Sequence, residues 1–156
     1  MIARWEQGRT TIDTLLADRR LERVAPSREL ADALIDQAER HLATAAGNVE
    51  ADPTGSFQLA YDAARKALAA VLANQGLRSR GAGAHAVLLT AALAQLDPPM
   101  GRDLRQFDWL RRTRNSAEYP MPETPPITPG DANDALPLAR TIVAIAQRVI
   151  PTMPVY

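Results

Sequence analysis

The residue types best suited to chemistry lie close together in the segment that runs from Phe107 to Pro120. Nine consecutive positions of this segment include three arginines, an asparagine, a glutamate and a tyrosine, namely Arg111, Arg112, Arg114, Asn115, Glu118 and Tyr119. Planar guanidinium groups at the rim of a packed helix can bind a phosphate through two hydrogen bonds at once. The segment therefore predicts a surface that binds the phosphates of RNA or of a nucleotide, and that could take part in cleaving RNA.

The same residue types also fit a solvated helix surface with a purely structural role. Glu118 follows Arg114 by four positions, and Asp108 precedes Arg111 and Arg112 by three and four. Such pairs on an exposed helix stabilise it by only about 0.3 kcal/mol each. The residue types alone leave both interpretations of the segment open.

The charge of the chain is balanced, so the chain as a whole does not indicate a nucleic-acid or membrane partner. Its 156 residues include 18 basic and 18 acidic side chains, and no overall electrostatic field would attract a polyanion. Residues 100–114, in contrast, carry five arginines and two aspartates, a local surplus of three positive charges. An RNA partner is therefore expected at this patch.

Candidates for acid–base and metal chemistry are few. Cysteine is absent, which excludes disulfides, thiol catalysis and cysteine-ligated metal sites. The two imidazoles, His41 and His85, have neither a second histidine nor a carboxylate at metal-ligand spacing, so we expect no metal and no cofactor. His41 lies beside the apolar stripe of its helix and fits a structural role, whereas His85 follows Gly83 at a helix start and could line a site with the arginines.

The chain also lacks the features of an exported or membrane protein. Residues 1–7 contain no continuous apolar run of the kind found in signal peptides, and no stretch approaches 18 uninterrupted apolar residues. The sequence predicts a soluble protein of the cytoplasm, without a membrane partner.

The elements that must position these residues are helices, because apolar residues recur at helical spacing along nearly the whole chain and no segment alternates as a strand does. Short connections between helices favour antiparallel neighbours. We therefore expect an all-α fold, an up-and-down antiparallel bundle of five to six helices. The expected helices lie near residues 10–24, 27–48, 56–76, 84–96, 101–118 and 131–150.

Prolines divide this bundle. Five of them fall within residues 120–130, where fixed φ angles and missing N–H donors favour an extended strap over a helix. Pro137 is compatible with the last helix only if that helix begins just before it. A single domain is expected over residues 1–156, with residues 1–26 as an additional N-terminal helix.

The core is predicted from the residues that repeat on the apolar face of each helix. Its expected members are Leu34, Phe57, Tyr61, Leu68, Leu88, Phe107, Leu110, Ile142 and Val143. The apolar stripe of the second helix is expected to comprise Leu30, Leu34, Ala38, Leu42 and Ala45. The many alanines of the third helix should let neighbouring helix axes approach closely.

Three pieces of the sequence resemble the HEPN superfamily of small helical bundles. They are an alanine-rich helix from Tyr61 to Leu72 followed by Gly76, a helix start from Gly83 to Leu88, and the segment Leu110-Arg-Arg-Thr-Arg-Asn-Ser-Ala-Glu-Tyr119. The family's active form has an arginine followed a few residues later by a histidine, and it is a metal-independent ribonuclease that acts across the cleft of a homodimer. Arg114 and Asn115 match the first half of this motif, whereas Tyr119 occupies the position of the histidine.

This resemblance implies a HEPN-like helical domain with a role in a toxin–antitoxin or defence-type system. It implies catalytic roles for Arg114, Glu118 and Tyr119, and contacts with RNA or a nucleotide for Arg111, Arg112, Asn115 and His85. The implied partners are a second copy of the chain, RNA, and a cognate minimal nucleotidyltransferase that acts as antitoxin and would modify Tyr119. Because tyrosine is a poor acid–base group at neutral pH, the alternative is a non-catalytic module of the same fold that binds a nucleotide or a protein.

Overall fold

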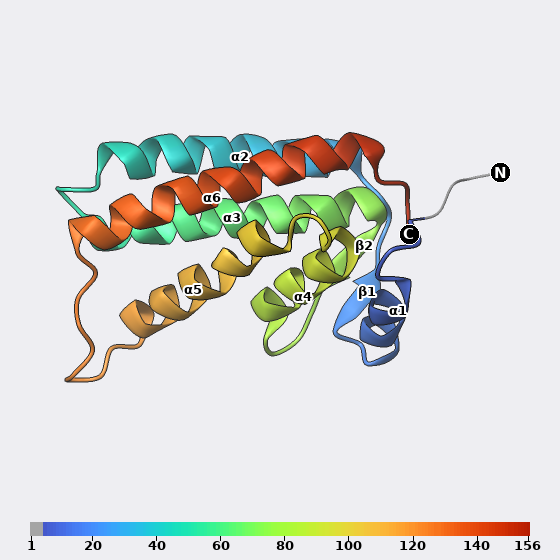
Figure 1. Cartoon of the computed structure of the whole chain (residues 1–156), viewed down its shortest axis with the longest axis horizontal. Helices are drawn as coiled ribbons and strands as arrows, with labels where there is room; N and C mark the ends of the chain where they lie inside the picture. The colour runs from blue at the N-terminus through green and yellow to red at the C-terminus, as the bar shows by residue number, and fades with distance from the viewer. Residues whose placement is uncertain (1–4) are drawn as a thin grey trace.

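A computed structural model describes residues 5–156 of the chain as helices joined by short connections (Figure 1). In chain order the elements are α1 (Arg9–Ala17), β1 (Leu21–Arg23), α2 (Arg28–Gly47), α3 (Pro53–Gln75), β2 (Leu77–Ser79), α4 (Ala84–Leu96), α5 (Gly101–Glu118), α6 (Pro129–Val149) and the 3-10 turn η1 (Ile150–Thr152). The expected all-α bundle is confirmed. In this part of the chain, no helix has both the length and the apolar character that crossing a membrane requires.

The long helix α3 is the centre of the fold. It packs against α2 and α6, which lie beside it along the long axis of the molecule, and against α4 and α5 (Figure 1). The helix α1 packs on α4 at the end of the molecule where α3 finishes. Residues from four helices therefore surround α3, and any polar side chain on its surface is placed next to side chains from distant parts of the sequence.

Local sequence signals fix the ends of the long helices. The side chain of Ser27 accepts a hydrogen bond from the Leu30 N–H at the start of α2, and Asp52 does the same for Gly55 at the start of α3. The helix α3 stops at Gly76, whose φ of 81° is left-handed. A side chain at this position would place its Cβ 2.9 Å from the Val24 carbonyl oxygen, so glycine is required there.

The expected first helix is too long. The helix α1 ends at Ala17, Arg19 adopts a left-handed conformation with a φ of 59°, and Leu21–Arg23 then forms the strand β1. This strand pairs with β2 in antiparallel register, with Leu21 opposite Ser79. A three-residue strand is too short to show alternation in the sequence, and its partner lies far along the chain, so the expectation that no strand forms was wrong here.

The last helix begins within two residues of the predicted position 131 and thus well before Pro137, so only the condition that it start just ahead of this proline was wrong. Thr128 and Asp131 form a capping box at its start, in which each side chain accepts a hydrogen bond from the other residue's backbone N–H. The strong cap extends the helix for two turns ahead of Pro137, whose ring is exposed. The proline is thus tolerated within α6 on its solvent side.

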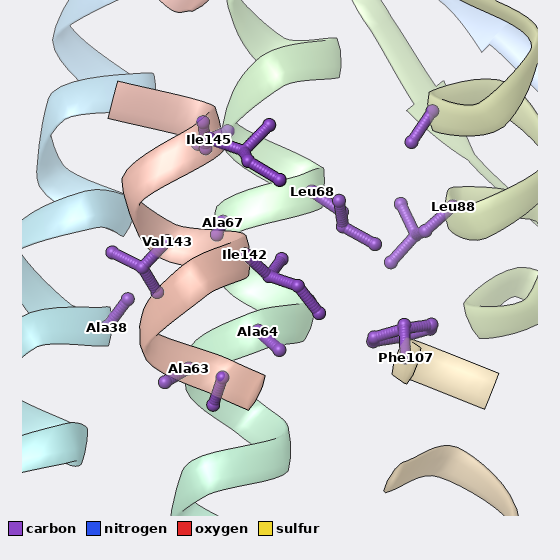
Figure 2. Packing of buried hydrophobic residues seen from close by; sticks show 14 of the residues in the cluster. Ala38, Ala63, Ala64, Ala67, Leu68, Leu88, Phe107, Ile142, Val143 and Ile145 are labelled. Carbon is purple, nitrogen blue, oxygen red and sulfur yellow. The ribbon is translucent and has the colours of Figure 1, made fainter. Parts of the chain in front are cut away.

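The core is built from small residues of α3 that face larger residues of the neighbouring helices. Figure 2 shows Ala63, Ala64 and Ala67 beside Ile142 and Ile145 of α6, and all of these side chains are buried. The same view shows Leu68 pointing toward Leu88 of α4. The alanines let the axes of α3 and α6 approach closely, as expected from their number.

The predicted core is confirmed except on α2. Eight of the nine predicted residues are buried, whereas Leu34 is only partly buried and Leu30 is 51% exposed. The buried face of α2 comprises Ala31, Ile35, Ala38, Leu42 and Ala45. Its first half is rotated by one residue from the predicted stripe, since Ala31 and Ile35 are buried in place of Leu30 and Leu34.

The last residue of the chain closes on the first helix. The Tyr156 hydroxyl lies 2.6 Å from Asp13 Oδ1 and 3.0 Å from the Arg9 carbonyl oxygen. The backbone N–H of Tyr156 donates to the Gln75 carbonyl at 2.9 Å, and Arg23 donates to the Tyr156 carbonyl at 2.8 Å. We refer to these contacts as the terminal clasp.

Candidate functional site

An open cleft with a volume of about 640 Å³ lies where α3, α4 and α5 meet. Its lining is polar and includes both signs of charge. The residues that line it are Gly55, Gln58, Leu59, Tyr61, Asp62 and Arg65 from α3, His85 from α4 and Arg114 from α5. We call this the α3–α5 cleft.

Tyr61 joins the functional side chains of the cleft. Its side chain is buried, with 2% exposed, and its ring stacks on Phe107 with centroids 5.5 Å apart. The Tyr61 hydroxyl and His85 Nδ1 are 2.7 Å apart, within hydrogen-bond distance. Arg114 Cζ lies 5.6 Å from the centroid of the Tyr61 ring, a cation–π distance. The imidazole and the guanidinium group are therefore held next to each other by one rigid ring.

Arg114 keeps its positive charge available. Within residues 5–156 it makes no salt bridge, and its nearest polar partner is Asn115 Oδ1 at 3.4 Å. The Arg114–Glu118 pair that the spacing allows does not form, because Glu118 is exposed and instead accepts a hydrogen bond of 3.3 Å from Gln58. The cleft thus contains a cation that no carboxylate of the described chain neutralises.

The other two arginines of the motif segment are paired, as their spacing allows. Arg111 Nη2 lies 2.9 Å from Asp108 Oδ1, and Arg112 Nε lies 2.7 Å from Asp108 Oδ2. Neither lines the cleft. Of the three arginines that the sequence offered, only Arg114 reaches it.

Asp62 organises the remaining charges of the cleft. Its Oδ1 accepts hydrogen bonds from Arg65 at 2.6 and 2.8 Å, and its Oδ2 lies 2.8 Å from Lys66 Nζ and 3.3 Å from His41 Nε2. Burial opposes ionisation of this carboxyl, but the hydrogen bonds from Lys66 and Arg65 outweigh it and lower the pKa of Asp62. The single carboxylate of Asp62 therefore pairs with two cations. Together with Arg114, these groups carry a net positive charge.

His85 is uncharged at neutral pH. Burial lowers its pKa from the ordinary value, and the positive charges of Arg65 and Arg114 lower it further, against the smaller opposing effect of Asp62. Burial also raises the pKa of Tyr61, so that its hydroxyl stays protonated. Nδ1 of His85 faces Tyr61, and in the described chain Nε2 neither has a hydrogen-bond partner nor is buried. The cleft therefore holds a neutral imidazole with one nitrogen free.

The structure separates residues that the resemblance had grouped together. The helix α5 ends at Glu118, and Tyr119 follows it with 77% of its surface exposed. Neither residue lines the cleft that contains Arg114 and His85, and Asn115 touches it only through Arg114. The predicted histidine equivalent, Tyr119, thus lies outside this cleft.

Tyr61, Asp62 and Arg65 belong to the cleft but were not predicted as site residues. Tyr61 was assigned to the core, where its ring does lie, and its hydroxyl was overlooked. The available signal was the recurrence of polar residues at positions 58, 62 and 65, on one face of an otherwise alanine-rich helix. In the described part of the chain, no group of three or more histidines, aspartates and glutamates is placed to hold a metal ion.

Comparison with known families gives a match over most of the chain. The family model described as HEPN domain matches residues 31–149, from α2 to the end of α6. Comparison with curated proteins gave no match, and neither did comparison with solved structures. The matched range contains every residue that lines the α3–α5 cleft.

Proposed function

The chain belongs to the HEPN family, and from that premise we propose that it binds RNA in the α3–α5 cleft and cleaves it without a metal ion. The observation that carries this proposal is Arg114, a cation without a carboxylate partner in residues 5–156, placed beside a neutral imidazole in an open cleft. A guanidinium group of this kind binds a phosphodiester through charge and directed hydrogen bonds. The biological setting that we propose is a toxin–antitoxin or defence-type system.

We further propose that the working form is a homodimer in which α5 lies near the twofold axis. The side chain of Trp109 on this helix packs edge-on against Phe57 at 5.4 Å and is still 37% exposed. Beyond the end of α5, Met121 is also exposed. A second copy that covers these apolar side chains would bring two Arg114 residues toward one RNA strand.

The exposed position of Tyr119 supports a second part of this proposal, control by a cognate minimal nucleotidyltransferase. A transferase can modify a hydroxyl only where the enzyme can reach it. Tyr119, with 77% of its surface exposed at the end of α5, meets this condition. A nucleotide attached there would add negative charge at the end of the helix that carries Arg114 and weaken the binding of RNA.

A non-catalytic binding module of the same family is the second candidate function. It is favoured by an apolar groove of about 360 Å³ at α2, α3 and α4. The residues that line this groove include Leu30, Leu34, Leu72 and Leu88. Exposed apolar side chains in a groove are typical of protein-binding sites. In this alternative the α3–α5 cleft would bind no RNA, and the measurement below distinguishes the two candidates.

The test compares RNA binding by the wild type, Arg114→Ala and the matched control Arg102→Ala. Arg102 lies on the same helix, is exposed, and does not line the cleft. We expect Arg114→Ala to weaken binding of a short single-stranded RNA by at least about tenfold, which corresponds to the loss of one charge-assisted contact. The wild-type affinity should fall steeply as salt is raised.

The melting temperature completes this test. Because no buried carboxylate loses its partner, Arg114→Ala should leave the helical circular dichroism signal and the melting temperature nearly unchanged. Wild-type protein that fails to bind RNA at low salt would contradict the proposal. An equal loss of RNA affinity in Arg102→Ala would contradict the α3–α5 cleft as the RNA-binding site.

A further inference from the structure

We infer that His85 is the general base of the α3–α5 cleft, held in place by Tyr61, and that it replaces the histidine which the motif on α5 lacks. This inference rests on the proposed function, because it requires RNA in the cleft. Tyr119 occupies the motif position of the histidine, but it is exposed and does not line the cleft. The other imidazole, His41, contacts Lys66 and Asp62 and does not line the cleft either.

The contact with Tyr61 engages Nδ1 of His85 and leaves Nε2 as the nitrogen that can act in the cleft. In the tautomer that carries the proton on Nδ1, this N–H donates a hydrogen bond to the Tyr61 oxygen at 2.7 Å. Nε2 is then left as an acceptor that faces the cleft. Tyr61 itself is fixed, since its buried ring stacks on the buried ring of Phe107. The same ring supports the guanidinium group of Arg114. The base and the phosphate-binding cation are therefore positioned by one side chain.

The reaction that fits these groups is an internal transfer within RNA. With a non-bridging phosphate oxygen bound by Arg114, the neighbouring 2′-hydroxyl gives its proton to His85 Nε2 and its oxygen attacks phosphorus. The bond between phosphorus and the 5′-oxygen breaks, and this oxygen takes a proton from water. The remaining hydroxide takes the proton back from His85. The products are a 2′,3′-cyclic phosphate and a 5′-hydroxyl, and neither an oxidant nor a metal ion is consumed.

The surrounding charges keep His85 in the form that this step needs. The titratable and charged groups that face it are Tyr61, Asp62 and Arg65 from α3, and Arg111 and Arg114 from α5. Burial and the three arginines lower the pKa of His85, so that its basic form predominates at neutral pH. The rate should therefore rise as the pH increases through this lowered pKa and reach a plateau near neutrality.

The experiment measures cleavage and binding separately on a short oligoribonucleotide, with the all-deoxy oligonucleotide as a substrate that lacks the nucleophile. We expect His85→Asn to lower kcat by about 100-fold or more, the usual contribution of a general base, with RNA affinity within about threefold of the wild type. His41→Asn is the matched control and should keep the wild-type kcat. Tyr61→Phe retains the stacked ring and should lower kcat less than His85→Asn does.

A second measurement has its deciding outcome in the wild type, which requires no variant to fold. The chain has only two histidines, so imidazole nitrogen NMR of the wild type has two side chains to assign. We expect His85 to be the neutral Nδ1–H tautomer at pH 7 in the wild type, and to lose this preference in Tyr61→Phe. A wild-type His85 in the Nε2–H tautomer would overturn the inference.

The outcomes separate this inference from the proposed function. Wild-type protein that binds RNA but does not cleave it overturns the role of His85 and the cleavage part of the proposed function, and leaves only RNA binding standing. Cleavage that persists at the wild-type rate in His85→Asn, or that proceeds on the all-deoxy strand, also overturns it. Wild-type protein that binds no RNA overturns the proposed function, and the inference with it.

Discussion

A buried tyrosine ring is what distinguishes Arg114 from the other arginines of α5. Arg111 and Arg112 bind the carboxylate of Asp108, whereas Arg114 lies over the face of Tyr61. A π face orients a guanidinium group without neutralising its charge. The ring thus positions a cation and leaves it able to bind an anion, which a salt bridge with a carboxylate would not do.

The histidines also predict how the stability of the protein depends on pH. Burial lowers the pKa of both His41 and His85 in the folded state, and the charges of Lys66 and of Arg65, respectively, lower them further. The unfolded chain therefore binds more protons below about pH 6.5, and the free energy of unfolding should fall as the pH drops from about 7.5 to about 5.5. Urea denaturation at these pH values measures the change.

The matched control for this prediction is the double variant His41→Asn/His85→Asn. The difference between its free energies of unfolding at the two pH values should be smaller than that of the wild type, whatever its absolute stability. Asp62, whose pKa is lowered in the folded protein, adds a separate loss below about pH 4, where its carboxylate takes up a proton more readily in the unfolded chain. A wild type that becomes more stable on acidification to about pH 5.5 would contradict the prediction.

Of the eight residues that line the candidate cleft, the sequence pointed to two, Arg114 and His85. Arg114 could be predicted because its neighbours on the chain form a recognisable motif, and His85 because so few imidazoles exist. Tyr61 and Asp62 could not, because their role depends on contacts between helices. Tyr61 and His85 are 24 positions apart, and no local pattern indicates that a core ring will direct its hydroxyl toward a surface histidine.

At the scale of the helices, Pro137 is a residue that the fold tolerates at a cost. It lies in the interior of α6, where it supplies no N–H to the preceding turn, and its ring is exposed. Pro137→Ala should therefore restore a hydrogen bond without loss of packing. After allowance for the greater freedom of the unfolded chain, we expect stabilisation by about 1 to 2 kcal/mol.

Chemical denaturation of Pro137→Ala measures this gain. Arg140→Ala, an exposed substitution on the same helix, should change the free energy of unfolding by less than about 0.5 kcal/mol. Destabilisation by Pro137→Ala would contradict this prediction, because it would mean that the exposed ring of Pro137 stabilises the folded protein.

Most of the helices could be predicted because their signals are local. The errors arose where contacts between distant segments of the chain determine the local structure. The caps at Ser27 and Asp52 and the stop at Gly76 act through neighbouring backbone groups. The strand pair of Leu21 with Ser79 depends on chain segments that meet only in the folded protein. The exposed Leu30 has the same cause, since packing against other helices buried the neighbouring Ala31 instead.

At the scale of the whole molecule, the proposed homodimer gives a direct prediction. Sedimentation or light scattering at tens of micromolar should give twice the chain mass of 16.9 kDa. Trp109→Lys should shift the protein to a monomer, because it places a charge where an apolar contact is proposed. Leu30→Lys, which alters an exposed leucine of the apolar groove, is the control and should leave the dimer intact.

Two results would contradict the dimer. A wild type that stays monomeric at these concentrations removes it altogether. Dissociation by Leu30→Lys but not by Trp109→Lys would move the interface from α5 to the apolar groove.

The terminal clasp has a consequence for the order in which the molecule folds and opens. Its contacts join Tyr156 to Asp13 and Arg9, which are 143 and 147 positions away, whereas Tyr61 and His85 of the cleft are only 24 positions apart. Closing the longer loop costs more chain entropy, so the clasp would form after the helices that build the cleft. It would also be the first part to open. Gln75, where the clasp contacts α3, lies about 21 Å along that helix from Tyr61 at a rise of about 1.5 Å per residue. The molecule would then lose and regain its clasp many times while the cleft stays assembled.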